Sequence, residues 1–510
     1  MERFVTRHQD CIAGILTGFD RMRFRGTLRS ISYARGVDKW LGARHVLLKD
    51  FGRWAEACST QLLAQAKQLA ADAGCPYEYL RSWRISKEDR VHALLAARPP
   101  ARPGLVAVFG CLEGCQSFTV RGDRTTKRLR VVPLERRCTH LYFYYWDHDF
   151  GLMHIRLETW LPFTIQVCVN GREWLAQQLR RRGVPFQQVD NCLLEVGDVA
   201  LAQRLVTQLE TRIWTRVLRV FGARVNPFLR AWGLRPYYWS LDESAYATDV
   251  LFRSADALQA LYPALVDQAT HHFRSPDVLR FLGRRHGPRS TGEVLTRIQR
   301  RLEGVRVKHW VEGNSLKMDD KERQVLRVET TLNQPRRFLV YRATARGSAR
   351  HWVPLRKGLA DLSRRVELSR AANARYLDAL GVVGIPRPIH QILDPLSHRR
   401  IVNARAFRPL RPIAPDESTC LAQLADARTL LAGVRARDLR RALTPHEPTD
   451  PHAHRRLTGR VSRLLRLYRA HGLIAKVTKT HRYRLTRKGH EVVTAALACR
   501  RATLQQLVAA

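Results

Sequence analysis

Apolar residues recur at two different spacings along the chain, and the change of spacing divides it into regions. Near the N-terminus Phe51, Trp54, Cys58 and Leu62 follow one another at intervals of three or four residues. This spacing is typical of one buried face of a helix. Together with the many arginines around it, the pattern predicts a mostly helical, basic region over residues 1–100.

From residue 105 the pattern changes to short runs of β-branched and aromatic residues, such as "HLYFYYW" and "FTIQVCV", which predict strands. Residues 211–300 are expected to be helical around an irregular aromatic patch, "RPYYWSLDESAYATD", and strands return over 305–342. We therefore expect residues 105–345 to form an α+β core around a mostly antiparallel sheet, with helices to one side.

The last third of the chain returns to helical spacing. A long helix and a connecting loop are expected over residues 350–412. Beyond them, residues 415–510 contain the helical segments "VRARDLRRALT" and "RRLTGRVSRLLRLYRAHGLI", two short strands and a final helix.

One strand pattern occurs twice in the core. "DFGLMHIRLET" begins at Asp149 and "DKERQVLRVET" begins at Asp320, and both place Arg, an apolar residue, Glu and Thr after the same interval. Side chains alternate along a strand, so each copy should present an Arg and a Glu on one face. These pairs are Arg156 with Glu158 and Arg327 with Glu329.

The repeated segment suggests that the core is built from two similar halves whose polar faces form one cleft. In that arrangement Glu158 and Glu329 would bind one divalent cation, Mg²⁺ or Mn²⁺, with Asp149 and Asp320 at the corresponding turns. A second version has each Arg–Glu pair orient a phosphate. The alternative is that the two segments are ordinary amphipathic hairpins that agree by strand chemistry.

The second copy resembles a hairpin of rolling-circle plasmid replication initiators. The resemblance covers about twenty residues, "SLKMDDKERQVLRVETTL", and the usual turn tyrosine is Asp319 here. It implies a DNA-nicking or strand-transfer core, although neither the tyrosine nor a two-histidine motif transfers to this chain. Tyr376, in "NARYLDAL", is the best other candidate nucleophile, and its alternative role is a core tyrosine of an amphipathic helix. "FGLMHIRLETWLPFTIQVCVNGREWLA" is similar to uncharacterised bacterial proteins.

The C-terminal segment carries a second resemblance. Its longer helix has an apolar stripe with arginines on the opposite face, and "HGLI" and "RYRLTRKG" follow. This order resembles a winged helix-turn-helix over about 70 residues. The resemblance implies that the helix enters a major groove and that the wing contacts phosphates. The implied contact residues are Arg456, Arg460, Arg463, Lys476, Lys479 and Arg482. A winged helix used only for protein contacts is the alternative.

The net charge of the chain indicates what kind of partner it binds. The 88 Lys and Arg residues exceed the 45 Asp and Glu residues, for a net charge of +43 and a pI near 11.1. A high-GC genome explains a choice of Arg over Lys, but not an excess over acids, so a polyanion is expected. Arg21, Arg23, Arg25 and Arg29 lie at nearly alternate positions, which suits either a phosphate backbone or a solvated edge strand.

Other segments limit the possibilities. No run of eighteen apolar residues occurs, and the N-terminus has no signal-peptide pattern, so a cytoplasmic protein with reduced cysteines is expected. The cluster of Cys111, Cys115, Cys138 and His140 could hold zinc, but its spacing favours small core thiols. The absence of a P-loop argues against ATP use.

These observations together predict a nucleic-acid-binding protein. DNA is the expected partner, with a core similar to replication initiators or transposases and a winged helix at the C-terminus. A non-catalytic DNA- or RNA-binding regulator, or an RNA partner, is the alternative.

Overall fold

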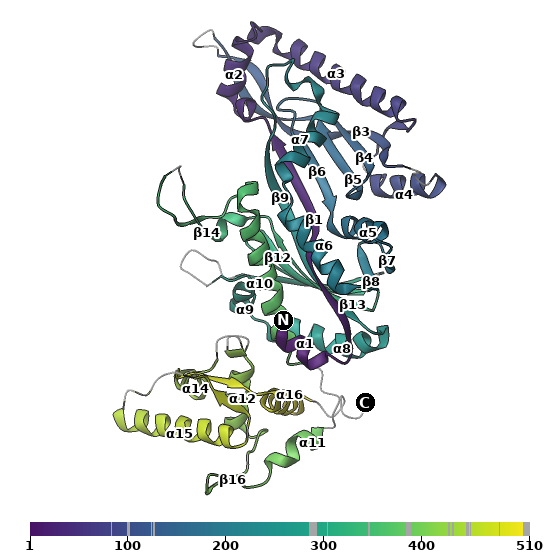
Figure 1. Ribbon diagram of the computed structural model, residues 1–510. Coiled ribbons are helices and arrows are strands. Elements are labelled where there is room, and N and C mark those ends of the chain that lie inside the picture. The colour runs from purple at the N-terminus through teal and green to yellow at the C-terminus, as the bar shows by residue number, and fades with distance from the viewer. Residues whose placement is uncertain are drawn as a thin grey trace.

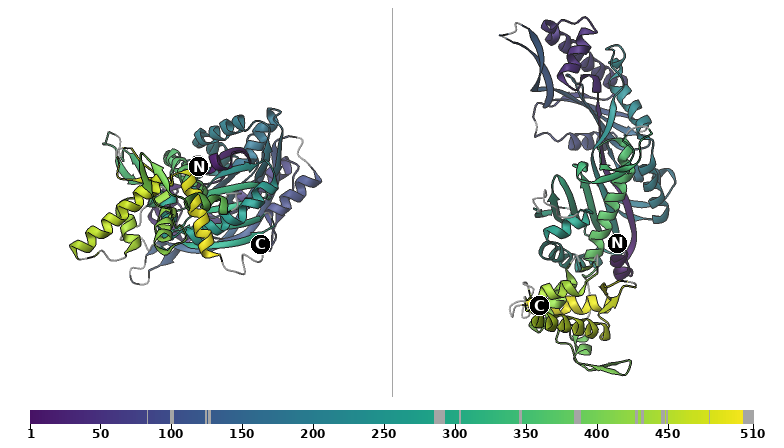
Figure 2. Two further views of the ribbon diagram at one scale, coloured as in Figure 1. Left: turned by 90° about the horizontal axis from the view of Figure 1, so that it is seen from below. Right: turned by 90° about the vertical axis from the view of Figure 1, so that its left-hand side faces the viewer.

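The computed structural model describes the chain except at positions 83, 99–101, 124, 126–127, 285–292, 303, 345–346, 384–388, 427–428, 431–432, 445–447, 449, 479 and 503–510. Within the described part the fold is α+β, as expected: helices surround one large mixed sheet, and a smaller module follows (Figure 1). The molecule is elongated, with the C-terminal module at one end (Figure 2).

Among the described residues the large sheet has eleven strands, in the order β10-β11-β12-β13-β9-β1-β6-β5-β4-β3-β2. Neighbouring strands are antiparallel except β2 with β3. The strands are β1 (Ile12–Thr27), β2 (Tyr77–Tyr79), β3 (Gly104–Gly122), β4 (Leu129–Asp147), β5 (Gly151–Glu158), β6 (Ile165–Asn170), β9 (Tyr238–Phe252), β10 (Leu295–Arg301), β11 (Gly304–Val311), β12 (Asn314–Lys321) and β13 (Val325–Leu332).

The centre of this sheet is a long two-stranded ribbon made by β1 and β9. β6 pairs only with the C-terminal part of β1, from Arg21 to Gly26, and β13 pairs only with the C-terminal part of β9, from Ala245 to Leu251. Because β1 and β9 are antiparallel, the two flanks of the sheet attach to opposite ends of the ribbon.

The edge of β1 that β6 leaves open is covered by helix α6 (Val199–Thr211). The Gln203 side chain accepts the Thr17 N–H at 2.8 Å and donates to the Thr17 carbonyl at 3.0 Å, so it takes the place of a neighbouring strand. Helix and strand approach closely because position 18 is glycine: a Cβ there would lie 1.9 Å from Val206 Cγ1.

The open edge of β9 is covered in a similar way by the segment before helix α10 (Leu362–Leu380). The Leu241 N–H donates to the Lys357 carbonyl at 2.8 Å, and the Lys357 ammonium lies 2.7 Å from Asp242. On each unpaired edge of the ribbon, backbone groups thus find hydrogen-bond partners outside the sheet, at Thr17 and at Leu241.

The β6 side of the sheet is covered by helices that follow the predicted apolar spacing. Phe24 of β1 and Trp214 form a ring contact at 4.5 Å in the largest buried cluster, which also includes Ile155 and Val167. The helices around this flank are α2 (Ala34–Gly42), α3 (Phe51–Asp72), α4 (Lys87–Ala97), α5 (Gly171–Arg181) and α7 (Trp214–Val225).

The β13 side has its own core. Leu326 and Val328 of β13 pack with Tyr376 and Leu377 of α10. The other helices here are α1 (Glu2–His8), α8 (Ala255–Asp267) and α9 (Ser275–Phe281).

The C-terminal module packs around a separate buried cluster that includes Leu421, Leu439, Val461 and Val492. Its sheet is small: β18 pairs with β19, and Val434 forms an isolated bridge to Tyr483. The elements are α11 (Ile389–Leu393), β16 (Arg400–Val402), β17 (Arg405–Phe407), α12 (Pro415–Ala425), α14 (Ala436–Leu443), α15 (Pro451–Ala470), β18 (Ile474–Lys476), β19 (Tyr483–Leu485) and α16 (Arg487–Arg501).

Three sequence expectations are corrected. Residues 1–100 do not form a separate helical region, because residues 12–27 are the central strand of the sheet. Residues 238–252, expected within a helical stretch, form β9. The loop expected within 350–412 contains the hairpin of β16 and β17. None of the helices in the described part of the chain is long and apolar enough to cross a membrane.

Candidate nucleic-acid interface

Helix α15 separates its apolar and basic residues onto two faces. Asp450 caps its N-terminus by accepting the backbone N–H groups of His452 and Ala453, each at 3.0 Å. The helix sequence contains no Asp or Glu. Its buried residues include Leu457, Val461 and Tyr468, whereas all six of its arginines are exposed: Arg455, Arg456, Arg460, Arg463, Arg466 and Arg469.

At the usual 3.6 residues per turn these six arginines occupy one half of the helix circumference. In the described part of the chain only Arg460 has an ion-pair partner, Asp416, and that pair is exposed on both sides. The arginine face of α15, meaning these six residues, is therefore a largely uncompensated positive surface. The sequence pattern identified Arg456, Arg460 and Arg463 and missed the other three.

A groove of about 560 Å³ runs beside this face and was not expected from the sequence. It lies between α15 and the segment 406–417, and its basic lining residues are Arg408, Arg411, Arg460, Arg463 and Arg466. Acidic groups reach it too, since Arg408 pairs with Glu417 at 2.6 Å.

The β16–β17 hairpin is held at the C-terminal end of α15. His471 joins the two: its carbonyl accepts from Arg400 at 3.3 Å, and its Nε2 lies 3.0 Å from the Arg408 carbonyl. The hairpin turn uses Asn403 and Ala404 with φ of 50° and 61°. The sequence signal was the short alternation "RIVNARAF" around an Asn-containing turn.

The strands β18 and β19 place basic residues next to α15. Lys476, at the end of β18, is exposed, and Arg482 is partly exposed. Lys479, the third expected phosphate contact here, lies outside the described residues.

The basic row on β1 is more compensated than the face of α15. Arg21 and Arg23 both pair with Glu243, at 3.0 and 2.6 Å. The Arg29 guanidinium lies 3.3 Å from the centre of the Tyr238 ring. Arg25, next along the row, is half-buried. The row therefore lies on the central strand and, at Arg29, on the short 3-10 helix that follows it, rather than on an edge strand as one interpretation had it. It has acidic or aromatic partners along most of its length.

Glu158, at the end of β5, has two basic neighbours. Arg156 Nη2 and His140 Nε2 both lie 3.8 Å from Glu158 Oε1. The expected Arg–Glu pair thus forms in the first copy of the repeated segment. Arg156 is shared with Gln166, at 3.1 Å, and Glu113, at 3.6 Å.

The second copy lies in a buried charge lattice. Glu329 pairs with Lys317 at 3.0 Å, and Lys317 also pairs with Asp319 at 3.0 Å. Burial and the nearby Asp20 raise the pKa of Glu329, and Lys317 offsets this only in part. Burial alone would lower the pKa of Lys317, but the carboxylates of Glu329 and Asp319 outweigh it and raise that pKa.

Arg327 does not pair with Glu329. Its guanidinium lies 2.6 Å from Asp249 and 3.0 Å from Asp20, and it donates to the Asn191 carbonyl at 2.8 Å. Arg172 reaches Asp249 from α5 at 2.8 Å. Burial disfavours ionisation of Asp249, but the two arginines outweigh it and hold its pKa below the ordinary value. Because Arg327 is fully buried, it cannot orient a phosphate as expected.

The expectation that Glu158 and Glu329 share a cleft is wrong. β5 is separated from the central ribbon by β6, whereas β13 pairs directly with β9, so the two copies occupy different positions in the sheet. Glu329 lies level with Gly18 of β1, and the end of β5 lies level with Gly26. Eight residues of strand separate these levels by about 26 Å.

The two aspartates also lie in different settings. Asp149 is in the turn after β4, where burial disfavours its ionised form but hydrogen bonds from Arg212 and Arg181 outweigh burial and lower its pKa. Asp320 lies within β12 instead of a turn, 2.9 Å from the Gln259 amide, and burial raises its pKa. The turn there is formed by Glu322 and Arg323.

Tyr376 is fully buried in the core of the β13 flank. Its hydroxyl lies 3.2 Å from His309 Nε2, and burial raises its pKa. A side chain in this position cannot reach a phosphodiester, and it corresponds to the core tyrosine that was the alternative for this residue.

The cysteine cluster packs as core thiols. Cys111, Cys115 and Cys138 are free and buried, and burial contributes to a raised pKa for Cys111 of about 12. Over the described residues no group of three or more His, Cys, Asp or Glu side chains is arranged to hold a metal ion. Comparisons with protein-family models, curated proteins and solved structures find no match to this chain.

Proposed function

We propose that this protein binds nucleic acid, and that duplex DNA is read by the C-terminal module. The observation that carries the proposal is the arginine face of α15: six exposed arginines on a helix without an acidic residue. Arginine is the side chain best suited to guanine edges and to phosphates, and a helix of this width fits the major groove.

The order of elements in the module supports a winged-helix interpretation. Helices α12 and α14 flank the single-residue strand at Val434, then α15 leads into the β18–β19 hairpin. In this interpretation α15 is the recognition helix, and Lys476, Lys479 and Arg482 of the wing contact phosphates. The β16–β17 hairpin would add Arg400 and Arg405 at the C-terminal end of α15, where His471 holds it.

For the core we propose a secondary role in binding through the row Arg21, Arg23, Arg25 and Arg29, with Arg156 on a neighbouring part of the sheet. A two-halves origin of the sheet is supported by its strand order: β1 is followed by helices and the strands β3 to β6, and β9 is followed by helices and the strands β10 to β13. In each set the last strand returns beside the first. Under this proposal β6 corresponds to β13. The two copies of the repeated segment lie on β5 and β13, so they do not occupy equivalent strands of the two halves.

A core similar to replication initiators or transposases stays a proposal, and a non-catalytic DNA- or RNA-binding regulator, or an RNA partner, stays the alternative. The test is a titration of labelled duplex DNA, single-stranded DNA and RNA against the full chain at several salt concentrations. Affinity for duplex should fall with salt by about 0.9 log units per log unit for each phosphate contacted. The same samples, incubated with Mg²⁺ or Mn²⁺, report any cleavage.

Duplex affinity that does not change with salt would contradict the proposal. Preference for RNA over duplex DNA in the same titration would favour the alternative partner.

A further inference from the structure

The hairpin of β14 (Leu339–Arg342) and β15 (His351–Pro354) exposes two aromatic rings. Tyr341 and Trp352 are directly opposed across the two strands, with ring centres 5.4 Å apart. They are 53% and 58% exposed, and Leu339 and Pro354 beside them on the same face are exposed as well. One face of this hairpin is therefore an apolar surface in contact with solvent.

The other face holds the hairpin in place. Val340 packs against a buried cluster that includes Phe338 and Leu355. Arg342 Nε lies 3.2 Å from Asp361, and the Leu355 N–H donates to the Phe338 carbonyl at 2.8 Å. The two rings are thus presented on an anchored ribbon.

Basic residues lie near the rings: Arg350 of the connecting loop is exposed, and Arg364 of α10 contacts the hairpin while pairing with Glu367 at 2.8 Å. Arg364 of α10 donates to the Leu339 carbonyl at 3.1 Å, and its guanidinium lies 5.7 Å from the centre of the Trp352 ring. The segment 339–354 contains three arginines and one histidine but no Asp or Glu. Because this segment carries no negative charge and the chain has a net charge of +43, charge complementarity favours a polyanion as the occupant.

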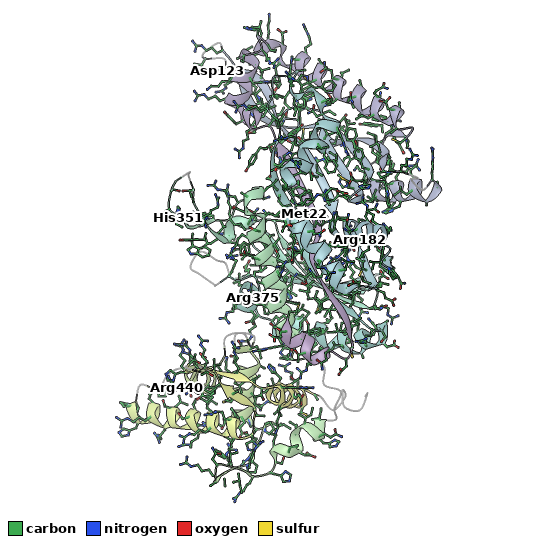
Figure 3. All side chains as sticks on the ribbon, in the orientation of Figure 1. Met22, Asp123, Arg182, His351, Arg375 and Arg440 are labelled. Atoms are coloured by element: carbon green, nitrogen blue, oxygen red, sulfur yellow. The ribbon has the colours of Figure 1, made fainter. Side chains whose placement is uncertain are left out.

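From these features we infer that the β14–β15 hairpin is a stacking platform for single-stranded nucleic acid, an inference that rests on the proposed function but assigns it a second surface. Bases in a duplex are already stacked on each other, whereas an unpaired base can stack on an exposed ring while arginines hold the backbone. The hairpin lies well away from α15 (Figure 1), and His351 of β15 is at the outer edge of the molecule, far from Arg440 of α14 (Figure 3).

The experiment measures binding of the full chain to labelled (dT)₂₀ and to a 20-base-pair duplex. The variants are Tyr341→Ala, Trp352→Ala, the double variant and Trp352→Phe, and the control is Tyr33→Ala, which removes a ring that is 54% exposed on another part of the surface. Each alanine at the hairpin should weaken (dT)₂₀ binding on the order of 10-fold and leave duplex binding within about 2-fold. Trp352→Phe keeps a ring and should retain most of the affinity.

Oligonucleotides containing 5-bromouracil give an independent measurement. On irradiation they should crosslink to Tyr341 or Trp352, located by mass spectrometry of the digested complex. Unchanged (dT)₂₀ affinity in the double variant would overturn the inference. So would an equal loss of duplex and (dT)₂₀ binding, or a change of oligomeric state with (dT)₂₀ binding intact, which would make the rings a protein interface. The proposed function fails separately, if duplex binding is absent or independent of α15.

Discussion

The buried charge lattice and the arginine face of α15 use the same residue types to opposite ends. The lattice contains four cations and four carboxylates within the sheet: Arg172, Arg306, Lys317 and Arg327, with Asp20, Asp249, Asp319 and Glu329. The face of α15 contains six arginines with only one acidic partner among the described residues, Asp416. The first region is neutral and buried; the second is positive and exposed.

This difference shows that the basic residues behind the net charge of +43 have different roles in the two regions. Arginines of the lattice are already neutralised, and removing one would leave buried carboxylates without partners. Arginines of α15 stabilise little, because the exposed Arg460–Asp416 pair is the one ion pair they form within the described residues, and so they are available to a partner. Substitutions in the two regions should therefore have different effects on unfolding and on binding, and the largest expected change in free energy comes first.

The largest effect is expected for Arg327→Met. Asp20 and Asp249 would remain buried without their main partner, and losing one member of a buried ion pair costs about 3–5 kcal/mol of unfolding free energy. Urea unfolding measures it. Arg463→Met on α15 is the matched control and should change stability by less than about 0.5 kcal/mol. Arg327→Lys, which keeps the charge, should fall between them. Equal stability of both methionine variants would remove the distinction between the two regions.

The next largest effect is the pH dependence of the unfolding free energy that comes from buried histidines. Burial lowers the pKa of His309 to about 4, from an unfolded value near 6.5. The unfolded chain binds the proton more tightly, so the contribution is present above pH 6.5 and is lost as the pH falls towards 4. It amounts to about 3 kcal/mol.

His309→Gln should therefore flatten the fall in stability between pH 6.5 and 4, measured by urea unfolding at each pH. The remaining slope is expected from His8, His154 and His490, whose pKa values burial also lowers to about 4. The exposed His452 of α15 is the control, and His452→Gln should leave the profile unchanged. A profile equally steep in both variants would contradict the role of His309.

The third prediction concerns the exposed side. The triple variant Arg456→Ala, Arg463→Ala, Arg466→Ala should weaken duplex binding roughly 100-fold, at about 1 kcal/mol for each arginine, and reduce the salt slope by about 2.7. Stability should not change. A triple variant of exposed arginines elsewhere, Arg53→Ala, Arg216→Ala and Arg219→Ala, alters net charge by the same amount. If it weakened binding equally, total charge rather than α15 would account for affinity.

The smallest effect is expected from the row on β1. Arg21→Ala with Arg23→Ala removes two cations that share Glu243, so the local field changes less than on α15 and duplex affinity should fall by less than about 5-fold. The single variant Glu243→Gln removes the carboxylate that Arg21 and Arg23 share, and it should strengthen duplex binding slightly. A loss as large as that of the α15 triple variant would move the main interface to the sheet.

The helix α15 was predictable because its information is local. Leu457, Val461 and Tyr468 recur at helical spacing and the arginines fall between them, so periodicity alone separated the faces. The strands β11 to β13 were found for the same reason, as short β-branched runs between turns.

β9 was missed because its part from Ser244 to Phe252 is buried on both faces and its acids have partners that are distant in sequence. Asp is depleted in strands, so Asp249 favours a loop by its local propensity, yet Arg172 and Arg327 neutralise it inside the sheet. The expectation that Glu158 and Glu329 share one cleft was wrong for a similar reason. Their shared pattern is a property of single strands, whereas their separation depends on which strand each one pairs with.

The central ribbon has a consequence for synthesis of the chain. The part of β1 from Ile12 to Phe19 pairs with β9 alone, which begins at Tyr238. At about 5–20 residues per second, a ribosome needs roughly 10–40 s to add the residues between β1 and β9. For that time residues 12–19, unlike the part of β1 that pairs with β6, have no partner strand, so we expect chaperones to contact this segment during synthesis.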